Sequence, residues 1–285
     1  MCTIVVHGTL AKEATWWRAE DRGRFLDAVA GGMQEGGQEP DLWTIGGRPV
    51  SQFKQLRPKR SWGFFGSKLP PFDNIEGHFC WSGANMHIER TRCGEELARY
   101  LETLSQICPG ETINLIAHSH GCNLIKVASH HVAPQVPIGR VVFLACPHCE
   151  NIAGGTGEYL YRLNPDSLSR DVGAGSPPVL NAYSEEDTVQ ADISEIAPDF
   201  LTSPGTPYAP IFDAHRSDPD PEASRAYEEF ELPTRVGKGI GAHQAVHSPT
   251  VGQVIGYWLA CWPGRTGPDC LGHFGIDVLT DASSG

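Results

Sequence analysis

The segment INLIAHSHGCN, residues 113–123, places one serine between two histidines directly after an apolar run. Ser119 has a small residue, Ala117, two positions before it and a glycine, Gly121, two positions after it. A serine at a sharp turn from a buried strand into a helix needs such small neighbours, because the strand and the helix pass closely there. Alanine stands for the first glycine of the usual pattern G-x-S-x-G. The segment therefore predicts a nucleophilic serine at a strand-to-helix turn.

A serine hydroxyl becomes an effective nucleophile when a base removes its proton, and imidazole does this near neutral pH. An acidic side chain would hold the imidazole in the correct tautomer and stabilise the imidazolium. The N-terminus of the following helix favours developing negative charge, and the amide of His120 would be one donor to an oxyanion. The side chains of His118 and His120 either pack around the turn or line an acyl pocket.

Apolar runs alternate with helical patterns along the chain. The runs expected as buried strands are residues 3–6, 113–117, 141–145 and 179–183. Apolar residues at helical spacing predict helices over residues 16–33, 87–107 and 122–129, and a last helix that starts at Pro249. Continuously apolar strands that alternate with helices indicate an α/β fold, with a mostly parallel sheet covered by helices on both faces.

Two segments interrupt this alternation and are expected as insertions in a single domain of residues 1–285. Residues 46–76 are rich in glycine, proline and aromatic residues, and residues 194–240 in proline, aspartate and glycine. Long irregular loops are commonly lids or binding loops. Three aromatic side chains of the first insertion either pack in the ordinary way or form an apolar lid or acyl pocket for a hydrophobic substrate: Trp62, Phe64 and Phe65.

The composition is that of a globular chain, with 40% hydrophobic and 20% charged residues. A formal net charge of −12 disfavours a nucleic-acid or anionic-membrane binder, because phosphate binding needs clustered lysine and arginine. The basic run KQLRPKR, residues 54–60, is interpreted as a surface loop, and the alternative is a basic patch for lipid headgroups, which would matter only if it flanks the active site. No window approaches the roughly 18 apolar residues of a membrane span.

The N-terminus passes from Met1 almost directly into the run IVV, without the basic and long apolar regions of a signal peptide. We therefore expect a cytoplasmic location at synthesis, and export by a leaderless route stays an open alternative. The chain has nine cysteines without the spacing of a disulfide framework, so most are expected to be buried thiols. Cys146 and Cys149 form one CxxC pair, and no second pair completes a zinc site. We expect neither a metal nor another cofactor.

At the serine turn, and in the order of the residues that follow it, the sequence resembles the α/β-hydrolase superfamily, in particular its lipase-like and esterase-like serine hydrolases. That family arranges its triad along the chain as nucleophile, acid and histidine. The resemblance implies that Ser119 is the nucleophile and that Asp187, in NAYSEEDTVQ, is the acid. It implies that His243, in GAHQAVHSPT ahead of the terminal helix, is the base.

Each of the last two assignments has an alternative. Glu185 and Glu186 are neighbouring carboxylates, but the spacing Y-S-x-x-D-x-V resembles that of the family and favours Asp187. His247 is the second histidine ahead of the terminal helix. The family places its histidine on a loop some residues before that helix, which favours His243 and leaves His247 a capping or surface role.

Two further segments carry the resemblance. After the first strand, His7 and Gly8 form an HG pair, which implies that the amide of Thr9 or Leu10 is a second oxyanion donor and that His7 orients this loop. The segment FLACPHCE is similar to the S/T-P-H-x-G loop of many lipases, but Cys146 and Glu150 depart from that pattern at its two ends.

The resemblance implies hydrolysis of a carboxylic ester through a Ser-His-Asp triad and an acyl-enzyme intermediate. A small-molecule ester or a lipid ester would be the substrate, and a lipid suits a site capped by two insertions. A phospholipase, thioesterase or amidase on the same scaffold is the first alternative, and a hydrolase-fold binding module without activity is the second. The acyl and alcohol parts of the substrate and the oligomeric state stay open.

Overall fold

A computed structural model describes residues 2–8, 24–45, 81–84, 87–107, 109–149, 161–168, 178–189, 212–213, 221–233 and 239–276. The segment 46–76, expected as the first insertion, lies entirely outside the described residues. Five residues with expected roles lie outside them as well: Thr9, Leu10, Trp62, Phe64 and Phe65. Their expected roles therefore stay predictions.

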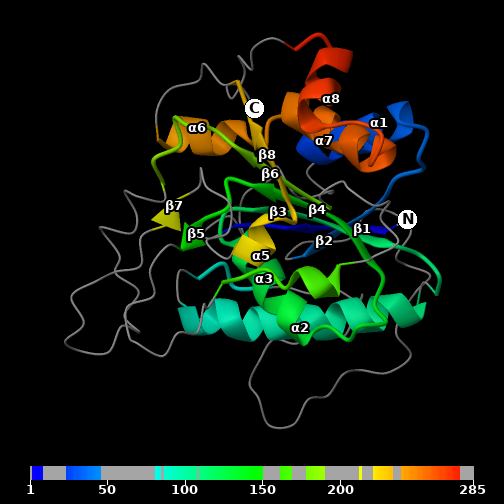
Figure 1. Ribbon diagram of the computed structural model, residues 1–285, viewed down its shortest axis with the longest axis vertical. Helices are drawn as coiled ribbons and strands as arrows, with labels where there is room; N and C mark the ends of the chain where they lie inside the picture. The colour runs from blue at the N-terminus through cyan, green and yellow to red at the C-terminus, as the bar shows by residue number, and fades with distance from the viewer. Residues whose placement is uncertain are drawn as a thin grey trace.

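A parallel sheet of six strands forms the centre of the described structure (Figure 1). The strands lie in the order β2-β1-β3-β4-β6-β8, and every neighbouring pair is parallel. They are β1 (Cys2–Val6), β2 (Asp41–Ile45), β3 (Ile113–His118), β4 (Ile138–Leu144), β6 (Val179–Tyr183) and β8 (Tyr227–Glu231). A short antiparallel pair, β5 (His148–Cys149) and β7 (Phe212–Asp213), lies beside this sheet.

Helices cover both faces of the sheet (Figure 1). On one face lie α2 (His87–Ile107) and α3 (Gly121–His131), and on the other lie α1 (Arg24–Glu35), α7 (Pro249–Cys261) and α8 (Gly267–His273). Shorter helices are α5 (Pro221–Ser224), α6 (Ile240–Ala245) and the 3-10 turn η2 (Pro165–Ser167). The predicted α/β fold with a parallel sheet between helices is confirmed. Among the described helices, none has the length and apolar content to cross a membrane.

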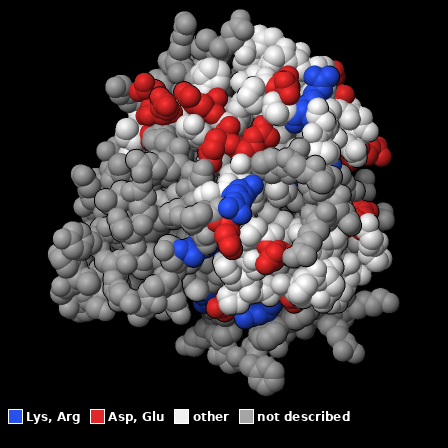
Figure 2. Space-filling view, viewed as in Figure 1, with Lys and Arg blue, Asp and Glu red and all other residues white. Residues whose placement is uncertain are grey.

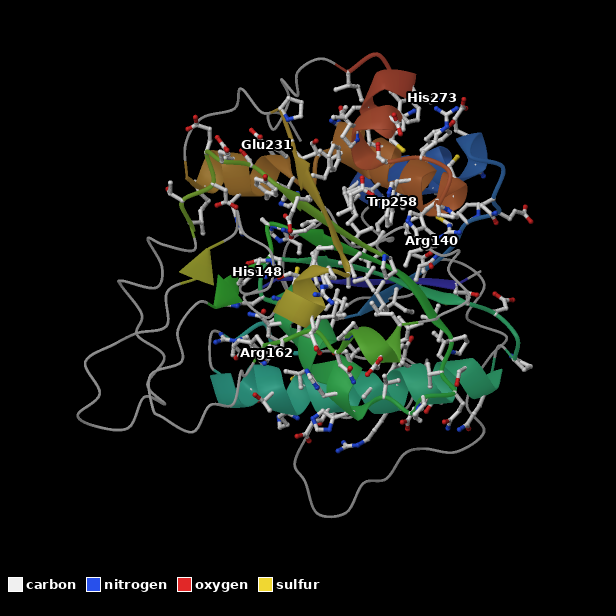
Figure 3. The ribbon with its side chains drawn as sticks, in the orientation of Figure 1. Arg140, His148, Arg162, Glu231, Trp258 and His273 are labelled. Carbon is white, nitrogen blue, oxygen red and sulfur yellow. The ribbon has the colours of Figure 1, made fainter. Side chains whose placement is uncertain are left out.

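Two hydrophobic cores lie on the two faces of the sheet, because successive strand residues point to opposite sides. In β3, Leu115 and Ala117 belong to the core under α2 and α3, whereas Ile116 belongs to the core under α1 and α7. Trp258 of α7 fills the second core and is fully buried (Figure 3). Burying a large apolar side chain of this kind contributes roughly 2–3 kcal/mol. All six residues of β3 are buried, so the strand before Ser119 is held from both faces.

The two edge strands were not predicted from the sequence. β8, with the sequence YEEFE, lies inside the segment 194–240 that was expected as an insertion. Only Tyr227 and Phe230 of this strand are buried, while its glutamates are at least partly exposed, as suits a sheet edge. A half-exposed strand with three glutamates lacks the continuous apolar run that marks the central strands. Part of the segment 194–240, expected as an insertion, therefore forms an edge strand of the central sheet.

Acidic side chains predominate on the described part of the face in Figure 2, in line with the net charge of −12. Glu185, Glu186 and Glu222 are exposed, and so is Glu231 of β8. This charge distribution is what the composition leads one to expect.

Glycines bring the backbones of α1 and α7 into direct contact. A Cβ atom on Gly32 of α1 would lie 2.0 Å from the backbone oxygen of Gln253, and one on Gly256 of α7 would lie 2.0 Å from that of Val29. No carbon atom fits at such distances, so a side chain at either position would force the helices apart. The glycines therefore fix how closely α7 packs, and α7 follows directly on the segment that holds His243 and His247.

We expect Gly32→Ala to lower the free energy of unfolding by roughly 1–3 kcal/mol, because its methyl group overlaps the carbonyl of Gln253. Gly31 is its matched control: it is exposed in the same helix, and a Cβ atom there would point into open space. Gly31→Ala should raise the free energy of unfolding by about 0.5–1 kcal/mol through helix propensity. Urea denaturation measures both, and effects of the same sign would contradict this account of the helix pair.

Candidate active site

Ser119 stands at the turn between β3 and α3 in a strained backbone conformation. Its φ angle is 53°, in the left-handed region that residues other than glycine rarely adopt. Its N–H donates to the carbonyl oxygen of Leu144 at 2.9 Å, and its carbonyl accepts from the N–H of Cys122 at 2.9 Å. Backbone strain of this kind costs about 1–3 kcal/mol and persists where the surroundings hold it in place. Here β4 and the first turn of α3 do so.

Small residues next to Ser119 let the end of β1 touch the turn. A Cβ atom on Gly121 would lie 2.5 Å from the carbonyl oxygen of His7. A Cβ atom on Gly8 would lie 2.8 Å from the Cβ of Ser119. Ala117, where the usual pattern has glycine, is fully buried, and its methyl group packs in the hydrophobic core. The glycine two positions after Ser119 thus has a steric cause, and so does Gly8 at the end of β1.

Trp81 holds the end of β1 from a segment far along the chain. Its indole N–H donates to the carbonyl oxygen of His7 at 3.1 Å, and its ring stacks on the imidazole of His7 with 5.2 Å between centroids. Nδ1 of His7 in turn donates to the carbonyl of Gly8 at 2.7 Å. Trp81 and His7 are both buried. These contacts fix the direction in which the chain leaves β1 beside Ser119.

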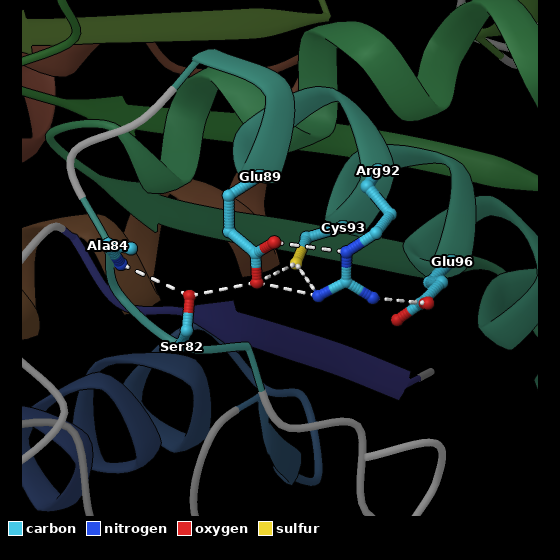
Figure 4. Close-up of polar contacts among 6 residues, drawn as sticks. All are labelled: Ser82, Ala84, Glu89, Arg92, Cys93 and Glu96. Carbon is cyan, nitrogen blue, oxygen red and sulfur yellow. Dashed lines mark hydrogen bonds and ion pairs between the residues drawn. The ribbon is translucent and has the colours of Figure 1, made fainter. Parts of the chain in front are cut away.

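The segment that carries this indole is itself tied to the first turns of α2 (Figure 4). Ser82 Oγ donates to Glu89 Oε1 at 3.0 Å and accepts from the N–H of Ala84 at 3.2 Å. Arg92 donates to both oxygens of Glu89, at 3.0 and 2.6 Å, and to Glu96 at 2.8 Å. The hydrogen bonds from Arg92 lower the pKa of Glu89, so the Glu89 carboxylate stays ionised and remains an acceptor for Ser82.

A histidine and a carboxylate form a short hydrogen bond at the carboxyl edge of the sheet. His243, in α6, places Nδ1 2.7 Å from Oδ2 of Asp187, which lies in the loop after β6. The other carboxylate oxygen of Asp187 accepts from the N–H of Val189 at 3.1 Å. Because a carboxylate only accepts, the imidazole carries its proton on Nδ1, and its Nε2 keeps a lone pair for a further proton. The carboxylate is fully buried and the imidazole nearly so.

Of the three neighbouring carboxylates, Asp187 is the buried one. Glu185 and Glu186 are exposed. The backbone of this loop also holds α6, because the N–H of Gly239 donates to the carbonyl of Glu186 at 2.8 Å. The loop after β6, which carries Asp187, and α6, which carries His243, are therefore joined by a side-chain hydrogen bond and by a backbone hydrogen bond.

His247, the alternative histidine, lies beside the same site without being the cap of α7. Ser248 is that cap, and its Oγ accepts from the N–H of Val251 at 3.4 Å. The ring of His247 packs edge-on against His118, with 4.9 Å between centroids. Burial, with a smaller effect of His243, lowers the pKa of His247 to about 3.

The histidines on either side of Ser119 are both buried among protein groups. His118 lies 4.6 Å from His243, measured between ring centroids. His120 accepts at Nδ1 from the side-chain amide of Asn123 at 3.0 Å. Burial lowers the pKa of both well below the usual value, and the neighbouring His243 adds to this effect at His118. Both imidazoles are therefore neutral at pH 7.

A buried lysine contacts the segment that contains Cys146 and His148. Lys126 Nζ donates to Nδ1 of His148 at 3.0 Å, and both side chains are fully buried. Cys146 is buried as a free thiol next to them. Within the described residues, no group of three or more His, Cys, Asp or Glu side chains could hold a metal ion.

The fold brings these parts together because they all follow carboxyl ends of parallel strands. Gly8 follows β1, Ser119 follows β3, Asp187 follows β6, and His243 follows β8, which is the last strand of this sheet. Carboxyl ends of parallel strands lie at one edge of the sheet, where α/β proteins bind ligands. The described residues thus define an α/β protein with a serine, a histidine and an aspartate at the edge of the sheet formed by the carboxyl ends of its strands.

Comparison with known proteins gives a distant structural likeness and no match in sequence. No protein-family model matches the sequence, and no curated protein matches it. Among solved structures, the chain is similar to lipase B of Aspergillus fumigatus, with a TM-score of 0.40 and 12% sequence identity. The likeness covers 90% of this chain and 51% of the lipase chain, so this chain spans about half the length of that structure.

We expect acid to destabilise the protein through its buried histidines. The pKa is about 3 for His247 and well below the usual value for His118 and His120. In the unfolded chain these imidazoles have a pKa of about 6.5, so below that pH the unfolded state binds more protons than the folded state does. Stability should therefore be full above about pH 6.5 and fall as the pH drops. Each such histidine steepens the fall by up to ~1.4 kcal/mol per pH unit.

Urea denaturation at several pH values between about 7.5 and about 4.5 measures this slope. His247→Gln should reduce it by up to ~1.4 kcal/mol per pH unit. The matched control is His131→Gln on the exposed end of α3, which should leave the slope unchanged. A slope that is the same in all three proteins would refute the assignment to buried imidazoles.

Proposed function

We propose that the protein is a serine hydrolase that cleaves carboxylic esters, with Ser119 as nucleophile, His243 as base and Asp187 as the acid that orients the base. The proposal depends above all on one observation, the 2.7 Å hydrogen bond between His243 and the buried Asp187. The strained turn of Ser119 at the same sheet edge supports it. So does the contact between the rings of His243 and His118, because His118 directly precedes Ser119.

In the proposed reaction, Oγ of Ser119 attacks the carbonyl carbon of the ester while Nε2 of His243 takes the hydroxyl proton. The imidazolium that forms is stabilised by the ionised Asp187 through the hydrogen bond at Nδ1. The tetrahedral intermediate then collapses, and His243 gives the proton to the departing alcohol. Water repeats the sequence on the acyl-enzyme and releases the carboxylic acid, which restores Ser119.

Two amides would stabilise the oxyanion of the tetrahedral intermediates. The amide of His120 lies at the N-terminal end of α3, where the helix dipole favours negative charge. The second amide would come from Thr9 or Leu10, which directly follow the glycine packed against Ser119. Losing one such donor typically costs about 3 kcal/mol of transition-state stabilisation.

A lipid or other long-chain ester is the finer proposal for the substrate. It depends on the aromatic residues of the segment 46–76, of which Trp62, Phe64 and Phe65 would line an acyl pocket. A phospholipid, thioester or amide would use the same nucleophile and base. A panel of esters from about two to about sixteen acyl carbons, with a phospholipid, a thioester and an amide added, discriminates among them.

A fluorophosphonate probe, which reacts with activated serines, should label the wild-type protein on Ser119. Ser119→Ala should abolish both the labelling and the hydrolysis of p-nitrophenyl esters, because the attacking oxygen is gone. Ser105→Ala, on α2, is the matched control and should keep both. Mass spectrometry of the labelled peptides reports the site. If the wild-type protein takes no label and hydrolyses no ester, the hydrolase proposal fails, and the remaining hypothesis is a hydrolase-fold binding module without activity.

We expect Asp187→Asn to lower kcat by roughly 10³–10⁴-fold with a small change in KM, because asparagine favours the wrong tautomer of His243. Glu186→Gln removes an exposed carboxylate one position away and is the matched control. Steady-state kinetics on a p-nitrophenyl ester measures both. If Glu186→Gln has the larger effect on kcat, Asp187 is not the acid.

A further inference from the structure

The histidine before the nucleophile makes a contact that the proposed reaction does not require. Nε2 of His118 lies 3.3 Å from the backbone carbonyl oxygen of His243, and the two residues are 125 positions apart in the chain. A carbonyl oxygen only accepts, so the proton of this hydrogen bond belongs to Nε2 of His118. The bond joins the end of β3 directly to the residue that would act as base.

The carbonyl that accepts this bond lies near the end of a very short helix. α6 has six residues, Ile240–Ala245, and His243 is in its last turn. The last carbonyls of a helix have no amide donor within that helix, and one of this length has little stability of its own. Its position therefore depends on contacts with its surroundings. The bond from His118 is one that comes from the central sheet.

Close packing leaves the His118 ring little freedom to move. It touches the ring of His243 at 4.6 Å and that of His247 at 4.9 Å, with the latter at a right angle. From the other side comes the end of β1, where a Cβ atom on Gly8 would lie only 3.2 Å from Nδ1 of His118. A ring enclosed in this way donates in one fixed direction.

The charge state of this imidazole is consistent with a structural hydrogen bond. Burial, and to a smaller extent His243, His247 and His7, lowers its pKa well below the usual value. His118 is therefore neutral at pH 7 and carries a single ring proton. That proton is the one engaged by the carbonyl of His243.

We propose that His118 is a positioning residue: its Nε2–H bond to the carbonyl of His243 sets where α6 lies and thereby how the imidazole of His243 meets Ser119. The inference rests on the proposed function. It differs from the expectation that His118 lines an acyl pocket, since a pocket residue would act on substrate affinity and chain-length preference.

Three substitutions of His118 separate these roles. In His118→Gln the side-chain amide nitrogen reaches about as far as Nε2 and can donate the same bond. In His118→Asn the amide is too short, and His118→Phe keeps the ring volume without a donor. We expect the glutamine variant to keep kcat within about threefold of the wild type. The other two should lose roughly 10–100-fold in kcat with KM within about twofold, as for a misplaced catalytic group.

Kinetics on short and long p-nitrophenyl esters measures kcat, KM and chain-length preference for each variant. Equal kcat values for glutamine, asparagine and phenylalanine would overturn the proposal. So would a raised KM or an altered chain-length preference with kcat unchanged, which points to a pocket. If Ser119→Ala keeps the activity of the wild type, the proposed function fails. That result is distinguishable from the two outcomes above, which overturn only the positioning role of His118.

The wild-type protein provides a test that does not depend on folding of the variants. NMR of wild-type protein with ¹³C,¹⁵N-labelled histidine distinguishes the two neutral tautomers, and correlations from each ring to its own backbone assign the signals of His118 and His243. We expect the proton on Nε2 for His118 and on Nδ1 for His243. A proton on Nδ1 of His118 would overturn the proposal.

Discussion

The close approach of three backbone segments around Ser119 is the constraint on which the rest of the structure depends. The end of β1, the end of β4 and the first turn of α3 all meet at this residue, and each does so through backbone atoms. Only glycine at positions 8 and 121 permits that approach. The contacts hold Ser119 at a positive φ angle, the strained backbone conformation expected of a serine at a sharp strand-to-helix turn. The strain of the turn is thus offset by hydrogen bonds and by strands buried on both faces.

The pair formed by Asp187 and His243 has a different energetic character. Burying a carboxylate costs free energy, and the two N–H donors, from His243 and Val189, act against that cost. The same two hydrogen bonds fix the orientation of the carboxylate. Its orientation is inherited from the sheet: the acid loop follows β6, and the helix with His243 is tied to that loop by the bond between Gly239 and Glu186. The sheet and this backbone hydrogen bond therefore set the position of the Asp187 loop and of α6 relative to each other.

The sequence predicted those parts whose signal is local. β3, β6 and α2 were found because buried runs and helical periodicity lie within each element, whereas β2 and β8, at the two edges of the sheet, were missed. Ser119 stood out through the spacing of its small neighbours. Asp187 and His243 were chosen from the order of residues in a resembled family, since no local pattern joins two residues 56 positions apart. The contacts of Trp81 with His7 and of His118 with His243 had no sequence signal, because only the topology of the sheet brings these residues together.

The buried imidazoles also explain why a histidine, and not a stronger donor, precedes the serine. In the proposed reaction His243 becomes positively charged, and a lysine or arginine at position 118 would repel that charge at contact distance. A neutral imidazole donates one hydrogen bond of fixed direction and adds no charge. Burial keeps His118 in this neutral form, and desolvation of the partly buried His247 lowers its pKa to about 3. The positive charge that develops on His243 is then balanced by the carboxylate of Asp187, while His118 acts on its backbone, so positioning and electrostatics are carried by separate residues.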